Sequence, residues 1–206
     1  MLRVEVRELA REELDFGAGV AARGLRDNPT TVAVIGDDPL RRERYMQRSF
    51  SAILRAMEKP PLAAWRDNYI VGVAGMASPG SCQLSPFQLL TMMPRVRPTS
   101  LGMVRRTFRW VSEWEKRDPR ERHWHLGPVA VEGGMRGMGV GSQLMEELVN
   151  GMDRGGDRAY LETDKPENVV FYERFGFEVV DEALVLGAHN WFMTREPQVD
   201  GAARPA

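Results

Sequence analysis

The stretch HWHLGPVAVEGGMRGMGVGS, from His123 to Ser142, decides the fold of this chain. Residues 123–131 are predicted to form a strand, and a glycine-rich turn follows them. From Gln143 to Met152 an apolar residue recurs every three or four positions, which predicts an amphipathic helix. A glycine-rich turn between a strand and a helix lets backbone N–H groups approach an anion at the positive end of the helix. The pattern therefore predicts a site for a phosphate-bearing ligand.

Two familiar phosphate-binding loops do not fit this turn. A Walker loop requires Gly-Lys-Ser/Thr, which is absent here, and a dinucleotide-binding fingerprint from Gly137 requires Gly or Ala where Ser142 stands. Glu162 has a spacing suited to a ribose-binding acid, but too little chain remains to continue a doubly wound sheet. A tight turn that binds nothing is the remaining alternative from the glycines alone.

The pattern outside this stretch predicts alternating strands and helices in one domain over residues 1–196. Strands are expected at 2–7, 61–65, 69–76, 159–163, 177–186 and 191–194. Helices are expected at 100–116, between Pro166 and Gly176, and as a pair within 11–57. Residues 78–99 are expected to form a loop or a loosely helical insertion, and residues 197–206 a disordered tail.

Composition narrows the class of protein. The chain has 206 residues, 43% hydrophobic and 28% charged, with a formal net charge of −1. The balanced charge gives no electrostatic support for nucleic-acid binding, and no apolar run reaches the length of a membrane span or signal peptide. The single cysteine, Cys82, excludes an internal disulfide and a multi-cysteine metal site, so a reducing cytoplasm is expected, and no metal.

Three segments at matching spacing carry a resemblance to a known family. They are the strand ending Val129-Ala130-Val131, the turn Arg136-x-x-Gly139-x-Gly141, and Asn168-x-x-Phe171-Tyr172-x-x-x-Gly176-Phe177. Together they resemble the GCN5-related N-acetyltransferases (GNAT) over residues 123–180. The stretch YLETDKPENVVFYERFGF looks most like the puromycin-type antibiotic acetyltransferases. The resemblance implies a single α/β domain with a mixed, mostly antiparallel sheet of six or seven strands flanked by helices.

The same resemblance implies where coenzyme A binds. Backbone amides of the turn would hold the pyrophosphate, β-strand backbone at Val129 and Val131 would pair with pantetheine, and a bulge at Gly127-Pro128 would open the slot between strands. Asn168 would hold the pantetheine arm, and Phe171 is counted with this set although it is expected to face away from Asn168 and Tyr172. The full set is Val129, Ala130, Val131, Arg136, Gly137, Met138, Gly139, Val140, Gly141, Ser142, Asn168 and Phe171.

The catalytic groups are expected around the same slot. Asn168 and Tyr172 are four residues apart and share one face of a short helix, and the resemblance makes Tyr172 the acid that protonates the leaving thiolate. Three options stay open for the base: His125, whose imidazole is a competent base near neutral pH, Glu162 on the next strand, or ordered water. Trp110 and Trp114 are candidates to line the acceptor pocket.

These expectations predict an acetyl-CoA-dependent N-acetyltransferase that acts on a primary amine of a small molecule or peptide. Acetyl-CoA serves as co-substrate, and a second copy of the chain, in a homodimer, is a further expected partner. Two alternatives remain, an acyltransferase with another acyl donor or a hydroxyl acceptor, and a non-catalytic acyl-CoA sensor. No motif in the sequence identifies the acceptor.

Overall fold

The computed structural model describes residues 2–81 and 100–198, which fold around a seven-stranded sheet of order β1-β2-β3-β4-β5-β7-β6. The strands are β1 (Glu5–Glu8), β2 (Leu62–Arg66), β3 (Tyr69–Ala77), β4 (His123–Val131), β5 (Arg158–Thr163), β6 (Glu178–Val185) and β7 (Ala188–Arg195). The helices are α1 (Leu14–Leu25), α2 (Pro29–Ile35), α3 (Pro39–Ala56), α5 (Leu101–Glu115), α6 (Val140–Gly155) and α7 (Pro166–Glu173). This is the expected α/β class with a mixed sheet.

The sheet divides where β4 meets β5. These two strands are the parallel pair of the described sheet, and they pair only from His123–Arg158 to His125–Tyr160. On its other edge β4 continues antiparallel to β3 as far as Val131, with a register shift that sets Gly127-Pro128 opposite the single residue Gly75. This extra residue is the bulge expected at Gly127-Pro128. Beyond it β4 follows β3 and no longer pairs with β5, so the sheet opens.

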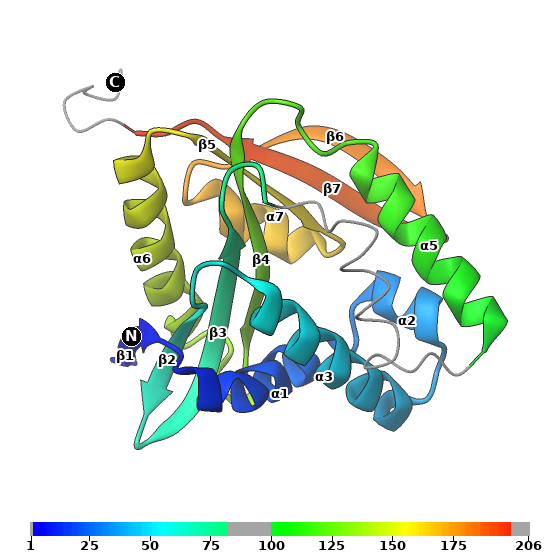
Figure 1. Cartoon of the computed structure of the whole chain (residues 1–206), viewed down its shortest axis with the longest axis horizontal. Coiled ribbons are helices and arrows are strands. Elements are labelled where there is room, and N and C mark those ends of the chain that lie inside the picture. The colour runs from blue at the N-terminus through cyan, green and yellow to red at the C-terminus, as the bar shows by residue number, and fades with distance from the viewer. Residues whose placement is uncertain (1, 82–99, 199–206) are drawn as a thin grey trace.

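Helices cover both faces of the sheet (Figure 1). On one face α1 and α3 pack with Met103 of α5, and Ala63 and Ala130 belong to that core. On the other face α6 and α7 cover a second core, which contains Ala64, the residue that follows Ala63, together with Leu144 and Leu161. The alternation of adjacent alanines between two cores follows from the two-residue period of a strand. None of the helices within residues 2–81 and 100–198 is long and apolar enough to cross a membrane.

Most predicted elements are present with small shifts at their ends, and one prediction is wrong. Residues 11–57 contain three α-helices rather than two, because the segment between the turns at Asn28-Pro29 and Gly36 is itself the helix α2. Pro29 at its first turn and Gly36 at its end, with φ of 102°, delimit it. Most of the 78–99 insertion, including Cys82, and residues 199–206 of the tail lie outside the described residues.

Candidate active site

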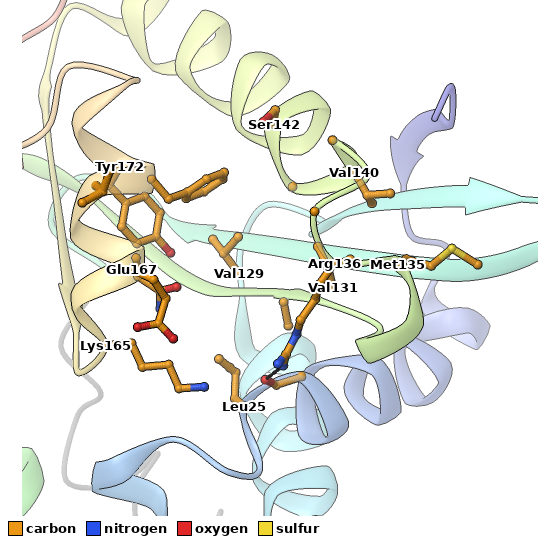
Figure 2. A pocket seen from close by; sticks show the side chains of 18 of the residues that line it. Leu25, Val129, Val131, Met135, Arg136, Val140, Ser142, Lys165, Glu167 and Tyr172 are labelled. Carbon is orange, nitrogen blue, oxygen red and sulfur yellow. Dashed lines mark hydrogen bonds between the residues drawn. The ribbon is translucent and has the colours of Figure 1, made fainter. Parts of the chain in front are cut away.

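A cavity of about 570 Å³ lies where β4 separates from β5. Its walls come from β4, the glycine-rich turn, the first turn of α6, and α7, with the end of α1 closing one side (Figure 2). Of the residues predicted to bind coenzyme A, all except Met138 line it. Met138 is 44% exposed, and its carbonyl accepts a hydrogen bond from the N–H of Leu2 at 2.9 Å. The cavity therefore collects the three motif segments in one place.

The glycine-rich turn presents backbone donors to this cavity. Gly137 and Gly139 have φ of 75° and 86°, in the left-handed region that side chains other than glycine rarely adopt. The first α-helical hydrogen bond of α6 runs from Gln143 N to Gly139 O at 3.2 Å. The N–H groups of residues 140–142 consequently have no acceptor within the helix. The turn thus offers an anion both free donors and the positive end of the helix dipole.

Charged side chains in the first cavity are mostly basic. Among the residues that the structure describes, Arg136, Lys165 and Arg174 line it, against one carboxylate, Glu167. Arg136 also has a structural role, because its Nη2 donates to the carbonyl of Gly24 at 2.6 Å and joins the turn to α1. A Cβ at Gly24 would lie 2.8 Å from the Cβ of Ala130, so glycine permits α1 to approach β4 here.

Tyr172 stands between this cavity and a second one. Its side chain points from α7 into the space beside Val129 of β4 (Figure 2), and it is 8% exposed. Burial raises the pKa of its hydroxyl, so the phenol stays protonated at neutral pH. Asn168, one helical turn earlier, donates from Nδ2 to Thr163 Oγ1 at 3.0 Å. Phe171 also lines the first cavity, so the expectation that it faces elsewhere is wrong.

The second cavity, of about 390 Å³, lies on the other side of Tyr172. It is bounded by α3, α5, the bulge of β4 and the end of β5, and both Trp110 and Trp114 line it, as do His125 and Glu162. Five residues line both cavities: Leu25, Asn28, Val129, Asn168 and Tyr172. The two cavities are therefore neighbours that share a wall at the opening of the sheet.

The two candidate bases are hydrogen-bonded to each other. His125 Nε2 lies 2.9 Å from Glu162 Oε2, and only 4% of the Glu162 side chain is exposed. On the opposite side of the ring, His125 Nδ1 lies 3.5 Å from Asp118 Oδ1. The His125 ring also meets the buried ring of Tyr160 edge to face, with 5.2 Å between centroids. Contacts with carboxylates on both sides of the imidazole hold its plane.

Asp118 joins His125 to the second histidine of the strand. His123 Nε2 lies 3.2 Å from Asp118 Oδ1, and His123 Nδ1 lies 2.8 Å from the Glu121 carbonyl. Burial of His123 favours the neutral ring, but the hydrogen bonds to Asp118 and Glu121 outweigh it and raise the pKa of His123. Burial and the nearby charges of Glu162 and Asp118 raise the pKa of Tyr160. A polar cluster thus lies between β4 and β5 at the inner end of the second cavity.

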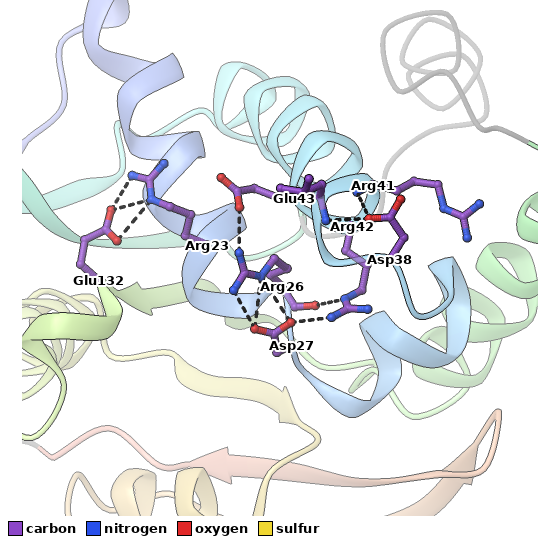
Figure 3. Close-up of polar contacts among 9 residues, drawn as sticks. Arg23, Arg26, Asp27, Asp38, Arg41, Arg42, Glu43 and Glu132 are labelled. Carbon is purple, nitrogen blue, oxygen red and sulfur yellow. Dashed lines mark hydrogen bonds and ion pairs between the residues drawn. The ribbon is translucent and has the colours of Figure 1, made fainter.

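Ion pairs hold the helical wall that borders both cavities (Figure 3). The buried guanidinium of Arg42 donates to the carbonyls of Arg26 and Gly36, each at 2.9 Å, and to Asp27 Oδ1 at 2.6 Å. Arg23 of α1 pairs with Glu132, which follows β4. These contacts hold the ends of α1 and α2 next to Leu25 and Asn28, the wall residues on that side.

Sequence reasoning missed several residues of this site. Asp118, Lys165, Leu25 and Asn28 were not among the residues that the sequence singled out for the site. The His-x-His pattern on β4 was a usable signal for a nearby polar partner, because buried side-chain polar groups are nearly always hydrogen-bonded. No local pattern identifies Leu25 or Asn28, since they reach the cavities through tertiary packing.

Comparison with known proteins now decides the family. Residues 31–177 match the Acetyltransferase (GNAT) family. The chain belongs to that family. The match spans more than half of the chain and includes the glycine-rich turn, the split between β4 and β5, and Tyr172. The protein is therefore an acetyltransferase of the GNAT type, with the two cavities on either side of Tyr172.

Solved structures share the fold of this GNAT chain. A Corynebacterium glutamicum protein described as histone acetyltransferase HPA2 and related acetyltransferase superposes with a TM-score of 0.71 at 18% identity, covering 98% of this chain and 100% of the other. A polyamine N-acetyltransferase from Drosophila melanogaster gives 0.63 at 13%, covering 94% and 100%. PaiA N-acetyltransferase from Thermoplasma acidophilum, in complex with coenzyme A, gives 0.58 at 15%, covering 95% and 99%. At these identities the likeness concerns the fold.

Proposed function

We propose that this GNAT protein transfers the acetyl group of acetyl-CoA to a primary amine of a small molecule or peptide. The observation that carries the proposal is the pair of cavities with opposite electrostatic character that share the wall at Val129 and Tyr172. The first has a helix N-terminus and three basic side chains, as an anionic donor requires. Among the described residues that line the second, the charged groups are Glu58, Glu162 and Asp164, with His125, as a cationic acceptor requires.

Acetyl-CoA fits the first cavity by the chemistry of its parts. The pyrophosphate would take the free N–H groups at residues 140–142, with Lys165 and Arg174 nearby to balance its charge. The pantetheine amides would pair with the backbone of β4 at Val129 and Val131, whose edge toward β5 is open beyond the bulge. The thioester would then lie at the shared wall, beside Tyr172 and Asn168.

The reaction needs three proton transfers at that wall, two from the acceptor nitrogen and one to the leaving sulfur. The ammonium of the acceptor loses a proton to the His125–Glu162 pair, either directly or through water, and the free amine attacks the thioester carbonyl carbon. The C–N bond forms and the C–S bond breaks, and the thiolate takes a proton from the Tyr172 hydroxyl. The acylated nitrogen then gives up its extra proton to the tyrosinate, directly or through water, which restores Tyr172. The raised pKa of Tyr172 keeps its hydroxyl protonated at neutral pH, so that the proton is present when the thiolate forms.

The test is turnover with acetyl-CoA and a panel of acceptors, following thiol release and identifying products by mass spectrometry. The panel holds simple amines, polyamines, aminoglycosides, peptides and puromycin, which the resemblance of residues 160–177 suggests. Each amine is paired with its hydroxyl analogue, and acetyl-CoA with butyryl-CoA. Acetylated amine supports the proposal. Ester products or preference for the longer donor favour the other acyltransferase, and tight CoA binding without any turnover favours a sensor.

Two expectations from the sequence remain proposals beside this one. The single cysteine, Cys82, favours a reducing cytoplasm as the location. A homodimer is the second, and sedimentation velocity of the purified protein measures it directly. Neither bears on the chemistry, because every group assigned to the reaction comes from one chain.

A further inference from the structure

The second cavity is walled by two helices that turn apolar side chains toward it. The wall residues are Met46, Phe50, Ile53 and Met57 at α3, and Trp110 and Trp114 of α5. The lining residues within 2–81 and 100–198 include no lysine or arginine. Sites built from apolar and aromatic walls with a few placed polar groups bind ligands mainly through buried apolar surface.

The carboxylates of this cavity are not equivalent. Asp164 is 7% exposed, and its two oxygens already accept hydrogen bonds, from Asn28 Nδ2 and from Thr30 N, both at 2.8 Å. Glu58 is exposed at the end of α3. Glu162 is the buried carboxylate at the reactive end, where it contacts His125. The interior therefore provides a partner for one ammonium group beside the thioester position.

The aromatic wall is held in one arrangement before any ligand binds. Trp114 Nε1 donates to Asn190 Oδ1 at 2.9 Å, and Asn190 is fully buried. Trp110 meets Trp114 edge to face, with 5.0 Å between ring centroids. Rigid aromatic side chains supply contact area at low entropic cost, and they do not provide the hydrogen bonds that a polar ligand loses when it leaves water.

We propose that the acceptor is a monoamine whose body is apolar, of the aryl-alkyl or long alkyl type, with a single charge at the reacting nitrogen. The inference rests on the proposed function and names its substrate class. The ammonium lies toward Glu162, and the body lies between α3 and α5 against Trp110 and Trp114. A second charge on the body that lies against the apolar wall of α3, between Glu162 at one end and the exposed Glu58 at the other, would lose its hydration to apolar neighbours.

The first test uses the unmodified enzyme with two series of amines and saturating acetyl-CoA. Along the n-alkylamines from propyl to hexyl, kcat/KM is expected to rise about fourfold per methylene, the gain from burying one such group. Phenethylamine is expected to exceed 1,4-diaminobutane, spermidine and aminoglycosides by about 100-fold or more, because those bodies carry further charges. A flat alkyl series, or a preference for polycations or peptides, overturns the inference.

A charge placed in the wall gives the second test. In Ile53→Glu the new carboxylate enters the cavity wall, and the preference is expected to move toward 1,4-diaminobutane by at least about tenfold relative to hexylamine. Gln47→Glu adds the same charge on the exposed face of α3 and should leave the ratio unchanged. Circular dichroism checks folding, and if Ile53→Glu does not fold, the alkylamine series still decides.

The outcomes separate this inference from the proposed function. If no amine accepts an acyl group from any donor, the proposed function and the substrate class fail together. If polyamines or peptides are acetylated efficiently and alkylamines are not, the amine acetyltransferase activity stands and only the substrate class is wrong. If hexylamine and phenethylamine lead the panel, and Ile53→Glu alone shifts the ratio, both are supported.

Discussion

His125 Nε2 and Glu162 Oε2 lie 2.9 Å apart across the parallel strands β4 and β5. The sequence presented these residues as alternative bases, each with its own pH signature. A hydrogen bond at this distance lets the two residues act on the acceptor as one unit, so they need not be alternatives. The choice between His125 and Glu162 therefore becomes a choice between the pair and a water relay that bypasses it.

The first prediction concerns the acidic limb of kcat/KM against pH. If the pair is the base, His125→Gln and Glu162→Gln should each remove or displace this limb. The double variant should lower kcat/KM by a smaller factor than the product of the two single effects. A water relay predicts that neither does and that the limb follows the pKa of the amine, so it moves with a less basic acceptor. Profiles unchanged in both variants would rule out the pair.

The motif segments explain how much of this site was predictable. The turn from Arg136 to Ser142, the bulge at Gly127-Pro128 and the helix bearing Tyr172 are local patterns. The turn lines the first cavity apart from Met138, the bulge lines the second, and Tyr172 lines both. The hairpin at β2 and β3 was equally visible, because two short runs of strand character flank a turn signal. The turn itself is the pair Asp67 and Asn68, both with positive φ. Local geometry and periodicity were sufficient in these places.

Tertiary packing accounts for what the sequence did not show. The helix α2 is short and was hidden between two turn signals, so periodicity had too few residues to reveal it. Asp118 meets His123 and His125 only because the loop after α5 returns beside β4. The apolar wall joins α3 to α5, which are far apart in sequence, so its chemistry could be read only from the fold.

The second prediction concerns Tyr172→Phe. Loss of the hydroxyl should lower kcat by about 10²–10⁴-fold, the usual range for a general acid, and leave acetyl-CoA affinity within a few-fold because the ring still packs. Steady-state kinetics and calorimetric titration measure the two effects. Tyr69→Phe removes a hydroxyl at a position that is 75% exposed and serves as the matched control. Retention of kcat in Tyr172→Phe would make the residue structural.

The third prediction concerns the glycine-rich turn. Gly139→Glu should abolish measurable acetyl-CoA binding, because a side chain and a negative charge then occupy the approach of the pyrophosphate. Gly139 has φ of 86°, so any side chain adds strain, and Gly139→Ala measures that part separately. We expect Gly139→Ala to bind more weakly than the unmodified protein and more tightly than Gly139→Glu. Equal affinity in all three proteins would contradict the assignment.

The fourth prediction concerns Arg42, which ties α1, α2 and α3 together beside the cavities. Arg42→Met keeps the apolar stem but leaves the carbonyls of Arg26 and Gly36 without this donor. Both hydrogen bonds are partly buried, and a carbonyl that loses its donor in such a place costs about 1–3 kcal/mol, so a loss of about 2–4 kcal/mol in the free energy of unfolding is expected by urea denaturation. Arg44→Met, on the exposed face of α3, should change stability by less than about 0.5 kcal/mol.

The last prediction concerns the pH dependence of stability through His123. Its pKa is raised in the folded protein above the ordinary value of 6.5, with Asp118 and the Glu121 carbonyl outweighing burial. A group whose folded pKa is raised binds its proton more tightly in the native state, so the native state is favoured most at low pH within this range. The contribution is complete below the unfolded pKa and is lost as the pH rises through the folded pKa.

Urea unfolding at intervals from pH 5.5 to pH 9 tests this sign. The unmodified protein should lose stability relative to His123→Gln as the pH rises above about 6.5, because the variant has no proton to lose there. Asp118→Asn keeps both histidine rings but removes the carboxylate that raises the pKa of His123. The stability of this variant should therefore also fall less with rising pH than that of the unmodified protein. A stability difference between the unmodified protein and His123→Gln that grows with rising pH would show that His123 is held neutral, contrary to the hydrogen bonds that surround it.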